Sequence, residues 1–517
     1  MLKNVTLSLT DLLGEEYINA VCASRAWLTG EDENELKRIA DEKVSFFPEA
    51  FAKRQNELMD HVGEKVVPAF ENQEQGAPTA AYRAAQHSAL APVNGLGAFR
   101  VGEDGRLFFT GKSEHYQISL GHSFPGYRLI RNAERIGIQN ATHNNTRGYV
   151  TRKTERHLIA LANGLSPEDP RMEQILSSRE SGVINTVINL ETGSLAVEAA
   201  LKMMLTRFYG LEKKEAPNEG KIPVFLVMAD NAGGITGNYH GTTVFAQTLR
   251  GLWPAFRDKA EECGLYKVVP VPINDVEAFG KIMETYNRDP YRTAGFCHEI
   301  IMMNYGGIRL KEAFLQECYR LCRQYDTPVL CDEIQSCAWY DGMFLFRQYH
   351  LTPDFVSIGK GFPGGVYPAS KMLSSARFDT MSQFGALVTN GQEELASLAY
   401  LITLTFVCLN GQEITENGRE YHRQLEVLAE KYPGMLTGAD GDGFMSALCF
   451  KEVETASAFC RYLNGKMCVD ASAQTYKPNC PPVVLTKLPL ITGKEMIGKL
   501  IGLFEKALNA VSEGKNE

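Results

Sequence analysis

The sequence predicts an α/β protein with a mostly parallel central sheet in a large domain and a smaller α+β domain. Between residues 180 and 375, short apolar runs such as VFLVMA, VVPVPI and FVSIGK alternate with stretches of helical periodicity. Runs without polar alternation indicate strands covered on both faces, and strands that alternate with helices favour parallel pairing. After residue 395 come helices, short strands around FMSALCF and a closing amphipathic helix, which is the pattern of an α+β unit.

These elements divide the chain into three parts. Residues 1–100 are rich in Glu, Lys, Ala and Leu and predict a helical N-terminal extension, which would serve packing or dimer stability. Residues 101–395 form the predicted large domain, whose start contributes to the small domain, and residues 396–517 form the small domain. The alternation in GRLFFTGKSEHYQISLGHSFPG predicts a hairpin that leads into a turn marked by glycine and proline.

Composition excludes several classes of protein. The 517 residues include 53 Lys and Arg against 62 Asp and Glu, so the formal charge of −9 gives no basic surface for nucleic acid. Twelve cysteines without a CxxC pair indicate a reducing compartment and no metal site. Asp11, Glu15 and Glu16 precede any apolar signal segment, and we expect no later apolar run to reach the roughly 18 residues of a membrane span. We therefore expect a cytoplasmic protein without a membrane partner.

Polar residues end two of the predicted strands. The apolar run PVLCDEIQS ends in Asp332, Glu333 and Gln335. The run FVSIG delivers Lys360 into the glycine-rich GKGFPGG, 28 residues after Asp332. Each feature alone is ordinary, because acids often end strands and lysines are usually solvated. Ligands of open α/β sheets bind beyond the carboxyl ends of the strands, so we expect these side chains to share one site.

A third motif offers a site for an anion. Thr192, Gly193 and Ser194 follow the run VINTVINL and open a helix, where backbone amides and a hydroxyl can hold a phosphate, although a hydroxyl there also serves as a helix cap. An enzyme that uses pyridoxal phosphate (PLP) needs a lysine for the Schiff base and a carboxylate against the pyridinium nitrogen. The three motifs together meet these needs.

The order of the motifs resembles the class III (omega-type) aminotransferases, a family of PLP-dependent transferases of fold type I. The matching stretches span about residues 105 to 510 and are TGSLAVEAALK, NYHGTT, VLCDEIQS, PDFVSIGKGFPGG, TNGQEELAS and LPLITGKEM. The resemblance implies the PLP-dependent transferase fold type I, a PLP cofactor and a homodimer with a shared active site.

The resemblance also implies roles for single residues. It makes Lys360 the lysine of the Schiff base and Asp332 the partner of the pyridine nitrogen. The other implied cofactor-binding residues contact the phenolic oxygen, the ring or the phosphate, and they are Gln335, Tyr239, His240, Gly193, Ser194 and, toward the phosphate of the neighbouring subunit, Thr389. The segment GKSEHYQISLGHSFP aligns with the substrate-side hairpin of the family and implies the substrate candidates His115, Tyr116 and Gln117. The alternative is that these three are ordinary alternating hairpin residues.

The activity implied by the resemblance is transfer of an amino group from an amine or amino acid to an oxo acid by ping-pong chemistry. A PLP-dependent racemase, decarboxylase or lyase on the same scaffold is the alternative, because a fold does not settle its chemistry. A non-catalytic homologue is disfavoured, since Lys360, Asp332, Gln335 and Thr389 are all present.

Three charges that the family uses to bind substrate carboxylates are absent. Thr242 stands where one arginine is expected, Leu485 or Thr486 where a second is expected, and Tyr305 where its acidic partner is expected. We infer that the usual carboxylate switch for glutamate and 2-oxoglutarate is missing or rebuilt.

Other positions bear on this departure. Leu195 stands where the family commonly has glutamate, which marks a divergent branch. Lys487, Arg147 and Arg152 offer replacement positive charge, but residues of these types usually lie at the surface.

Overall fold

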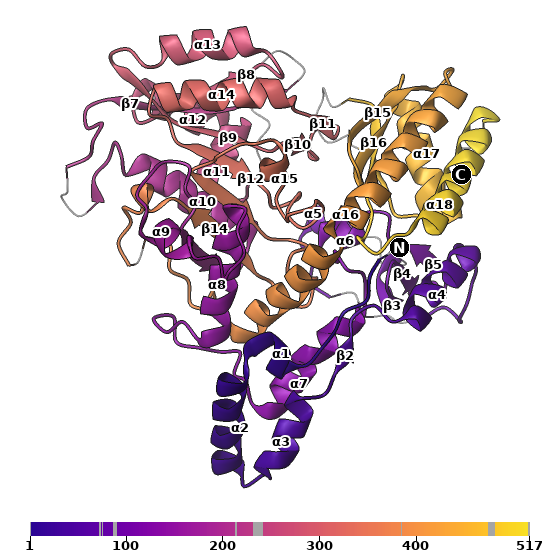
Figure 1. Ribbon diagram of the computed structural model, residues 1–517. Coiled ribbons are helices and arrows are strands. Elements are labelled where there is room, and N and C mark those ends of the chain that lie inside the picture. The colour runs from indigo at the N-terminus through magenta and orange to yellow at the C-terminus, as the bar shows by residue number, and fades with distance from the viewer. Residues whose placement is uncertain are drawn as a thin grey trace.

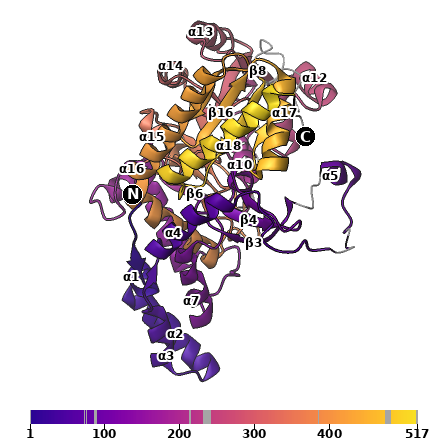
Figure 2. The same ribbon diagram turned by 90° about the vertical axis from the view of Figure 1, so that its right-hand side faces the viewer.

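A computed structural model describes residues 2–71, 74, 76–85, 90–211, 215–230, 241–383, 385–473 and 481–514 (Figure 1). A large α/β body lies beside a smaller α+β body at the C-terminal end of the chain, and a helical arm from the N-terminal region projects away from both (Figures 1 and 2).

The central sheet has seven strands in the order β6-β14-β13-β12-β9-β7-β8. Their bounds are β6 (Thr186–Leu190), β7 (Ile222–Met228), β8 (Lys267–Val271), β9 (Tyr291–His298), β12 (Val329–Asp332), β13 (Phe355–Ile358) and β14 (Ser370–Ser374). β14 pairs antiparallel with β13 and β6, and the other pairs are parallel. The prediction of a mostly parallel sheet is confirmed, while β14 lies outside the predicted strands.

Helices cover both faces of this sheet. Successive residues of β7 point to opposite sides, so that Phe225 and Val227 pack in one apolar cluster and Val224 and Leu226 in another. The first cluster includes α10 (Gly193–Leu205), α11 (Val244–Arg250) and α12 (Pro254–Glu262), and the second includes α13 (Val276–Thr285) and α14 (Glu312–Gln324). Strands buried on both faces explain why the sequence shows apolar runs without alternation.

The C-terminal body contains an antiparallel sheet of order β15-β16-β18-β17. Its elements are β15 (Leu436–Asp442), β16 (Met445–Phe450), β17 (Ser472–Ala473), β18 (Val483–Lys487), α17 (Val453–Tyr462) and α18 (Lys494–Ser512). A second sheet is formed by β3 (Pro92–Leu96), β4 (Phe99–Gly102) and β5 (Leu107–Phe109). Phe109 of β5 bridges to Val469, so this earlier part of the chain lies against the C-terminal body.

The N-terminal region is mainly helical. It holds β1 (Thr6–Leu7), α1 (Leu9–Leu13), α2 (Glu15–Thr29), α3 (Glu33–Ala40), β2 (Val44–Ser45), α4 (Glu49–Leu58) and α5 (Ala80–Ala85). α1, α2 and α3 pack with α7 (Arg128–Ile136) to form the projecting arm (Figure 1). Other short elements of the described chain include α9 (Met172–Ser177), β10 (Ile301–Met302), β11 (Ile308–Arg309) and α15 (Leu345–Gln348).

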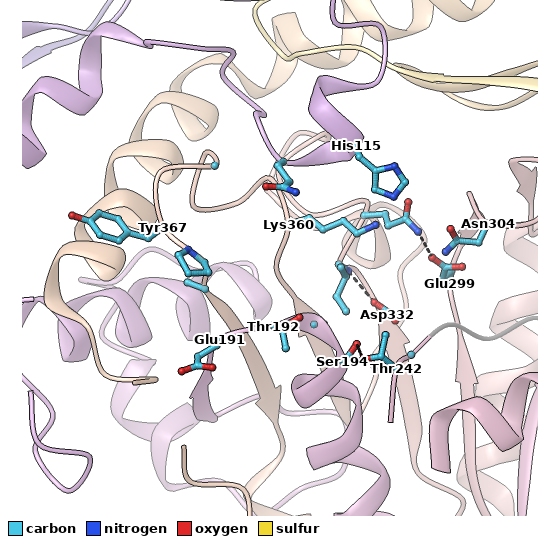
Figure 3. Close-up of a pocket in the computed structure, with 18 of the residues that line it drawn as sticks. His115, Glu191, Thr192, Ser194, Thr242, Glu299, Asn304, Asp332, Lys360 and Tyr367 are labelled. Carbon is cyan, nitrogen blue, oxygen red and sulfur yellow. Dashed lines mark hydrogen bonds between the residues drawn. The ribbon is translucent and has the colours of Figure 1, made fainter. Parts of the chain in front are cut away.

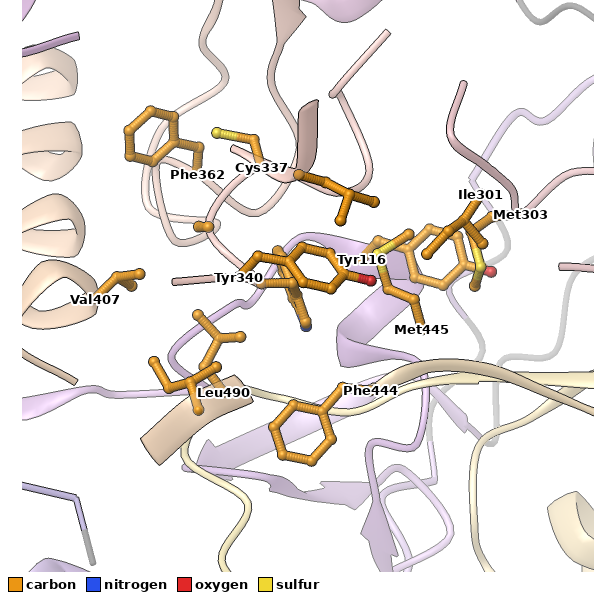
Figure 4. Packing of buried hydrophobic residues seen from close by; sticks show 14 of the residues in the cluster. Tyr116, Ile301, Met303, Cys337, Tyr340, Phe362, Val407, Phe444, Met445 and Leu490 are labelled. Carbon is orange, nitrogen blue, oxygen red and sulfur yellow. The ribbon is translucent and has the colours of Figure 1, made fainter. Parts of the chain in front are cut away.

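One long helix connects the two bodies. α16 (Glu394–Lys431) packs against α8 (Tyr149–Ala162) at one end and against β15 and α18 at the other. By length and composition alone it could cross a membrane, so the expectation that no apolar run is long enough for a span is wrong. However, 83% of its most apolar window is buried inside the protein, as in a core helix. Val407 of α16 packs in the central apolar cluster (Figure 4).

Candidate active site

A cavity of about 660 Å³ opens at the carboxyl ends of the central strands (Figure 3). Its lining brings together residues from the end of each of several strands and from the turns around them. These residues include His115, Gln117, Glu191, Thr192, Gly193, Ser194, Thr242, Arg250, Glu299, Asn304, Asp332, Gln335, Lys360 and Tyr367.

Asp332 and Lys360 share this cavity because their strands are parallel neighbours. Asp332 is the last residue of β12, and Lys360 follows the end of β13 by two residues. Asp332 is buried and its Oδ1 accepts a hydrogen bond of 3.0 Å from the amide of Ile334. Burial lowers the pKa of Lys360, and the carboxylates of Glu299 and Asp332 oppose this shift. The predicted pairing of carboxylate and lysine at one sheet edge is therefore present.

Glu299 is a cavity residue that the sequence interpretation missed. It follows the last residue of β9, and its buried Oε1 accepts a hydrogen bond of 3.0 Å from Nε2 of Gln335. Burial and the nearby Asp332 raise the pKa of Glu299 to about 8, against the effect of Lys360. An acid directly after an apolar strand, the same pattern that revealed Asp332, would have identified it.

Two buried acceptor atoms at this place have no protein partner in the described chain. They are Oε2 of Glu299 and Oε1 of Gln335. A buried polar atom left without a partner costs about 1–3 kcal/mol, so such atoms are usually satisfied by a protein group, a water molecule or a ligand. A cofactor that carries polar ring substituents fits this requirement.

The opposite end of the cavity suits a single phosphate. α10 begins at Gly193, and the side chain of its cap residue Thr192 makes no capping hydrogen bond, which leaves amides of the first turn available. The hydroxyl of Thr242 donates to Oγ of Ser194 over 2.9 Å. A Cβ atom at Gly193 would come within 2.4 Å of Cδ1 of Ile334, so a larger residue there would require the Ile334 side chain to move. The residues present therefore fit the phosphate of PLP.

The segment after β5 differs from the predicted hairpin. Residues Ser113–Tyr116 form α6, a single left-handed turn with φ values of 47°, 50°, 55° and 76°. Left-handed backbone is unfavourable by roughly 1–2 kcal/mol for each non-glycine residue, so the turn depends on contacts that hold it. Glu114 supplies two of them, because it accepts from Nη1 of Arg100 at 2.5 Å and lies 2.9 Å from Nε2 of His122.

The left-handed turn places the three substrate candidates differently. His115 and Gln117 line the cavity, while Tyr116 is buried with its ring centroid 4.9 Å from Nζ of Lys360. Burial and three lysines, of which Lys360 has the largest effect, lower the pKa of His115 to about 4. The interpretation of these residues as an alternating strand is wrong, since the strand ends at Phe109.

Three residues implied by the resemblance are not among the described residues that line this cavity. Thr389 is exposed and lies outside the cavity lining of the single chain. Tyr239 and His240 lie outside the described residues.

Two of the positions where charges are missing lie in the apolar core. Tyr305 and Leu485 are both fully buried, and a Cβ atom at Gly307 would lie 3.0 Å from Cδ2 of Leu485. Asn304, the residue before Tyr305, lines the cavity instead. The paired loss of an arginine and an acid is consistent with this packing, because either charge alone would be uncompensated.

The three candidates for replacement charge fall into two groups. Arg147 pairs with Glu155 at the surface and Arg152 is exposed, as residues of this type usually are. Lys487 is fully buried, so its assignment to the surface is wrong.

Comparison with known proteins agrees with this geometry. The family model for class III aminotransferases matches residues 82–508. The mitochondrial ornithine aminotransferase of Arabidopsis thaliana is 26% identical over 351 residues, covering 64% of this chain and 68% of the relative. The ornithine aminotransferase of Saccharomyces cerevisiae is 28% identical over 352 residues, covering 62% and 76%.

Solved structures show the same fold. The ornithine aminotransferase of Toxoplasma gondii superposes with a TM-score of 0.63 at 19% identity, over 82% of this chain and 91% of that one. A transaminase of the marine bacterium Virgibacillus gives a TM-score of 0.64 at 16% identity, over 85% and 97%. Another structure of the Toxoplasma enzyme holds PLP at its active site. The chain belongs to the class III aminotransferase family, and it is a PLP-dependent transaminase of fold type I.

Proposed function

We propose that Lys360 and Asp332 carry the amino-transfer reaction in the cavity at the strand ends. The observation that supports this most is the meeting of Asp332, Glu299 and Lys360 at adjoining strand ends within one cavity. Bound PLP supplies an electron sink that stabilises negative charge on the substrate carbon.

The residues of the chain would divide the work as follows. Asp332 holds a proton at the pyridine nitrogen, because a carboxylate favours the protonated ring. Lys360 would hold the cofactor through its amino group and would move a proton between substrate and cofactor. Gln335 contacts the phenolic oxygen. Burial lowers the pKa of Lys360, so a larger share of its amino groups is neutral and able to accept that proton.

The phosphate and ring would be held from other sides. Gly193, Ser194 and Thr242 bind the phosphate at the start of α10. Tyr239 and His240 contact the ring, as the motif resemblance implies.

The substrate would carry its reacting amine on a chain end without a nearby carboxylate. The expected arginine and its acidic partner are replaced by Leu485 and Tyr305, which are buried and do not line the described cavity. His115 and Gln117 in the lining offer uncharged polar groups. The similar proteins of Arabidopsis thaliana, Saccharomyces cerevisiae and Toxoplasma gondii are ornithine aminotransferases, and ornithine carries a terminal amine of this character. We therefore propose a terminal amine as donor and an oxo acid other than 2-oxoglutarate as acceptor.

A half-reaction assay tests this proposal. The PLP-loaded protein is mixed with ornithine and with simple terminal amines, and pyridoxamine phosphate is measured by chromatography. The pyridoxamine form is then mixed with 2-oxoglutarate and with smaller oxo acids. We expect product with a terminal amine and faster return to PLP with a smaller acceptor. Rapid return with 2-oxoglutarate would refute the acceptor assignment.

Two further results of this assay are decisive. The variant Lys360→Ala is expected to lose the visible band of protein-bound PLP and all pyridoxamine phosphate formation. Consumption of an amine with return of PLP, and without pyridoxamine phosphate, would favour racemisation, decarboxylation or elimination.

We also propose that the enzyme acts as a homodimer in the cytoplasm, with small molecules rather than nucleic acid or membranes as partners. The exposed Thr389 would then reach the phosphate in the neighbouring subunit. The eleven cysteines of the described residues are all free thiols, which supports a reducing compartment. The net charge of −9 and the burial of α16 support the choice of partners.

A further inference from the structure

We propose that Lys487 is a positioning residue for amino transfer, which fixes Tyr116 and the main chain of Gln335 beneath the cavity. The proposal rests on the proposed function, in which Lys360 and Gln335 contact the cofactor. Lys487 lies two residues after Leu485 on β18, so both side chains point to the same face of the strand. A basic group thus stands close to the position where the expected arginine is missing.

The backbone of Lys487 anchors the approach to the left-handed turn. Its amide donates to the carbonyl oxygen of Gly111 at 2.9 Å, and its carbonyl oxygen accepts from Oγ of Ser113 at 2.6 Å. Ser113 is the first residue of the turn that carries His115 into the cavity. β18 and the turn are therefore joined at this residue.

The side chain of Lys487 contacts the segment that follows β12. Nζ donates a hydrogen bond to the carbonyl oxygen of Gln335 and lies 3.6 Å from the ring centroid of Trp339. It also lies 5.0 Å from the ring centroid of Tyr116, the ring that Lys360 approaches from 4.9 Å. Figure 4 shows Tyr116 packed among apolar side chains such as Met303 and Met445. Lys487 thus joins three parts of the chain: its own strand β18, the segment after β12 and the left-handed turn.

Stability alone does not explain a lysine at this place. Lys487 is fully buried, and burial of an ionised amine is unfavourable by several kcal/mol even when hydrogen bonds compensate in part. Burial and the nearby Lys360 lower its pKa well below the usual range. The group donates to Gln335 in either protonation state, so positioning does not depend on its charge. We therefore expect that an apolar residue of similar size at this place does not lower the stability.

The first test compares Lys487→Met with a matched variant on the same strand. Thr486→Val removes the hydrogen bonds of a buried hydroxyl that faces Tyr421 and Ser446, away from the cavity. We expect Lys487→Met to melt at or above the wild-type temperature while kcat falls at least about tenfold, the effect of about 1.4 kcal/mol. Thr486→Val should melt lower with kcat unchanged. Wild-type kcat in Lys487→Met would overturn the proposal.

The second test reports on position without activity. Trp27 and Trp253 are 85% and 55% exposed, and replacing both by Phe leaves Trp339 as the single tryptophan of the chain. In this background, without cofactor, Lys487→Met should make Trp339 more accessible to acrylamide. Unchanged quenching would overturn the proposal, and so would loss of cooperative unfolding in both Lys487→Met and Lys487→Gln. A wild-type protein without transamination would refute the proposed function, while this readout would still test Lys487.

Discussion

The role proposed for Asp332 depends on its carboxylate group. Its carboxylate lies at the end of β12, buried and oriented by the amide of Ile334. We expect Asp332→Asn to lower the rate of the half-reaction about 100- to 1000-fold, because an amide does not hold a proton at the pyridine nitrogen. Single-turnover formation of pyridoxamine phosphate measures this. The exposed Asp379→Asn serves as control, and a loss of less than tenfold in Asp332→Asn would contradict the assignment.

Glu299 makes the stability of the cofactor-free protein depend on pH. Its folded pKa of about 8 lies above the ordinary value of 4.5, so its contribution to stability is complete below about pH 4.5 and is lost as the pH rises to about 8. The loss amounts to a few kcal/mol at about 1.4 kcal/mol per pKa unit. Urea unfolding at several pH values measures this, and the free energy of unfolding should depend less on pH in Glu299→Gln than in the wild type. If Glu299→Gln and the exposed Glu284→Gln show the same pH dependence of the free energy of unfolding, Glu299 is not its source.

Single residues differ in how well the sequence reveals them. Asp332 and Lys360 could be predicted, because parallel strands bring their carboxyl ends to one edge. Glu299 follows the same rule and could have been predicted in the same way. The burial of Lys487 could not be predicted, because lysine is almost always exposed and only the packing around Trp339 and Tyr116 reverses this.

At the scale of elements, strands were easier to predict than the left-handed turn. Apolar runs bounded by polar residues mark β7, β12 and β13, since burial on both faces leaves a local pattern. The turn Ser113–Tyr116 contains no glycine that would reveal it. Its conformation depends on contacts with Arg100, which precedes the turn, and with His122, which follows it. Long-range contacts therefore decide the part of the site that the sequence misassigns.

The start of α8 is stabilised from another helix. The carboxylate of Glu394 accepts from the amides of Val150 and Thr151 at 2.9 and 3.2 Å and from the hydroxyl of Thr151 at 2.6 Å. We expect Glu394→Ala to lower the free energy of unfolding by about 2–3 kcal/mol, because buried donors lose a charged partner. Urea denaturation measures this. Glu430→Ala, at an exposed position of the same helix, should stay within about 0.5 kcal/mol. Equal effects of the two variants would refute the capping role.

At the scale of the whole molecule, the proposed dimer makes a prediction about mixed subunits. If Thr389 serves the neighbouring site, a dimer of one Lys360→Ala and one Thr389→Ala subunit contains one intact site. Each variant alone should transaminate poorly, while subunit exchange should restore activity toward about a quarter of all sites. Assay before and after mixing at equal total concentration measures this. Without restoration in verified mixed dimers, Thr389 would have to act within its own subunit.

The 38-residue α16 has a mechanical consequence. At 1.5 Å per residue it is about 57 Å long, and its first turn caps α8 while its far end packs on β15 and α18. A continuous helix acts as a lever rather than a hinge. We therefore expect movement of the C-terminal body to be transmitted through α16 to the α8 end of the large body.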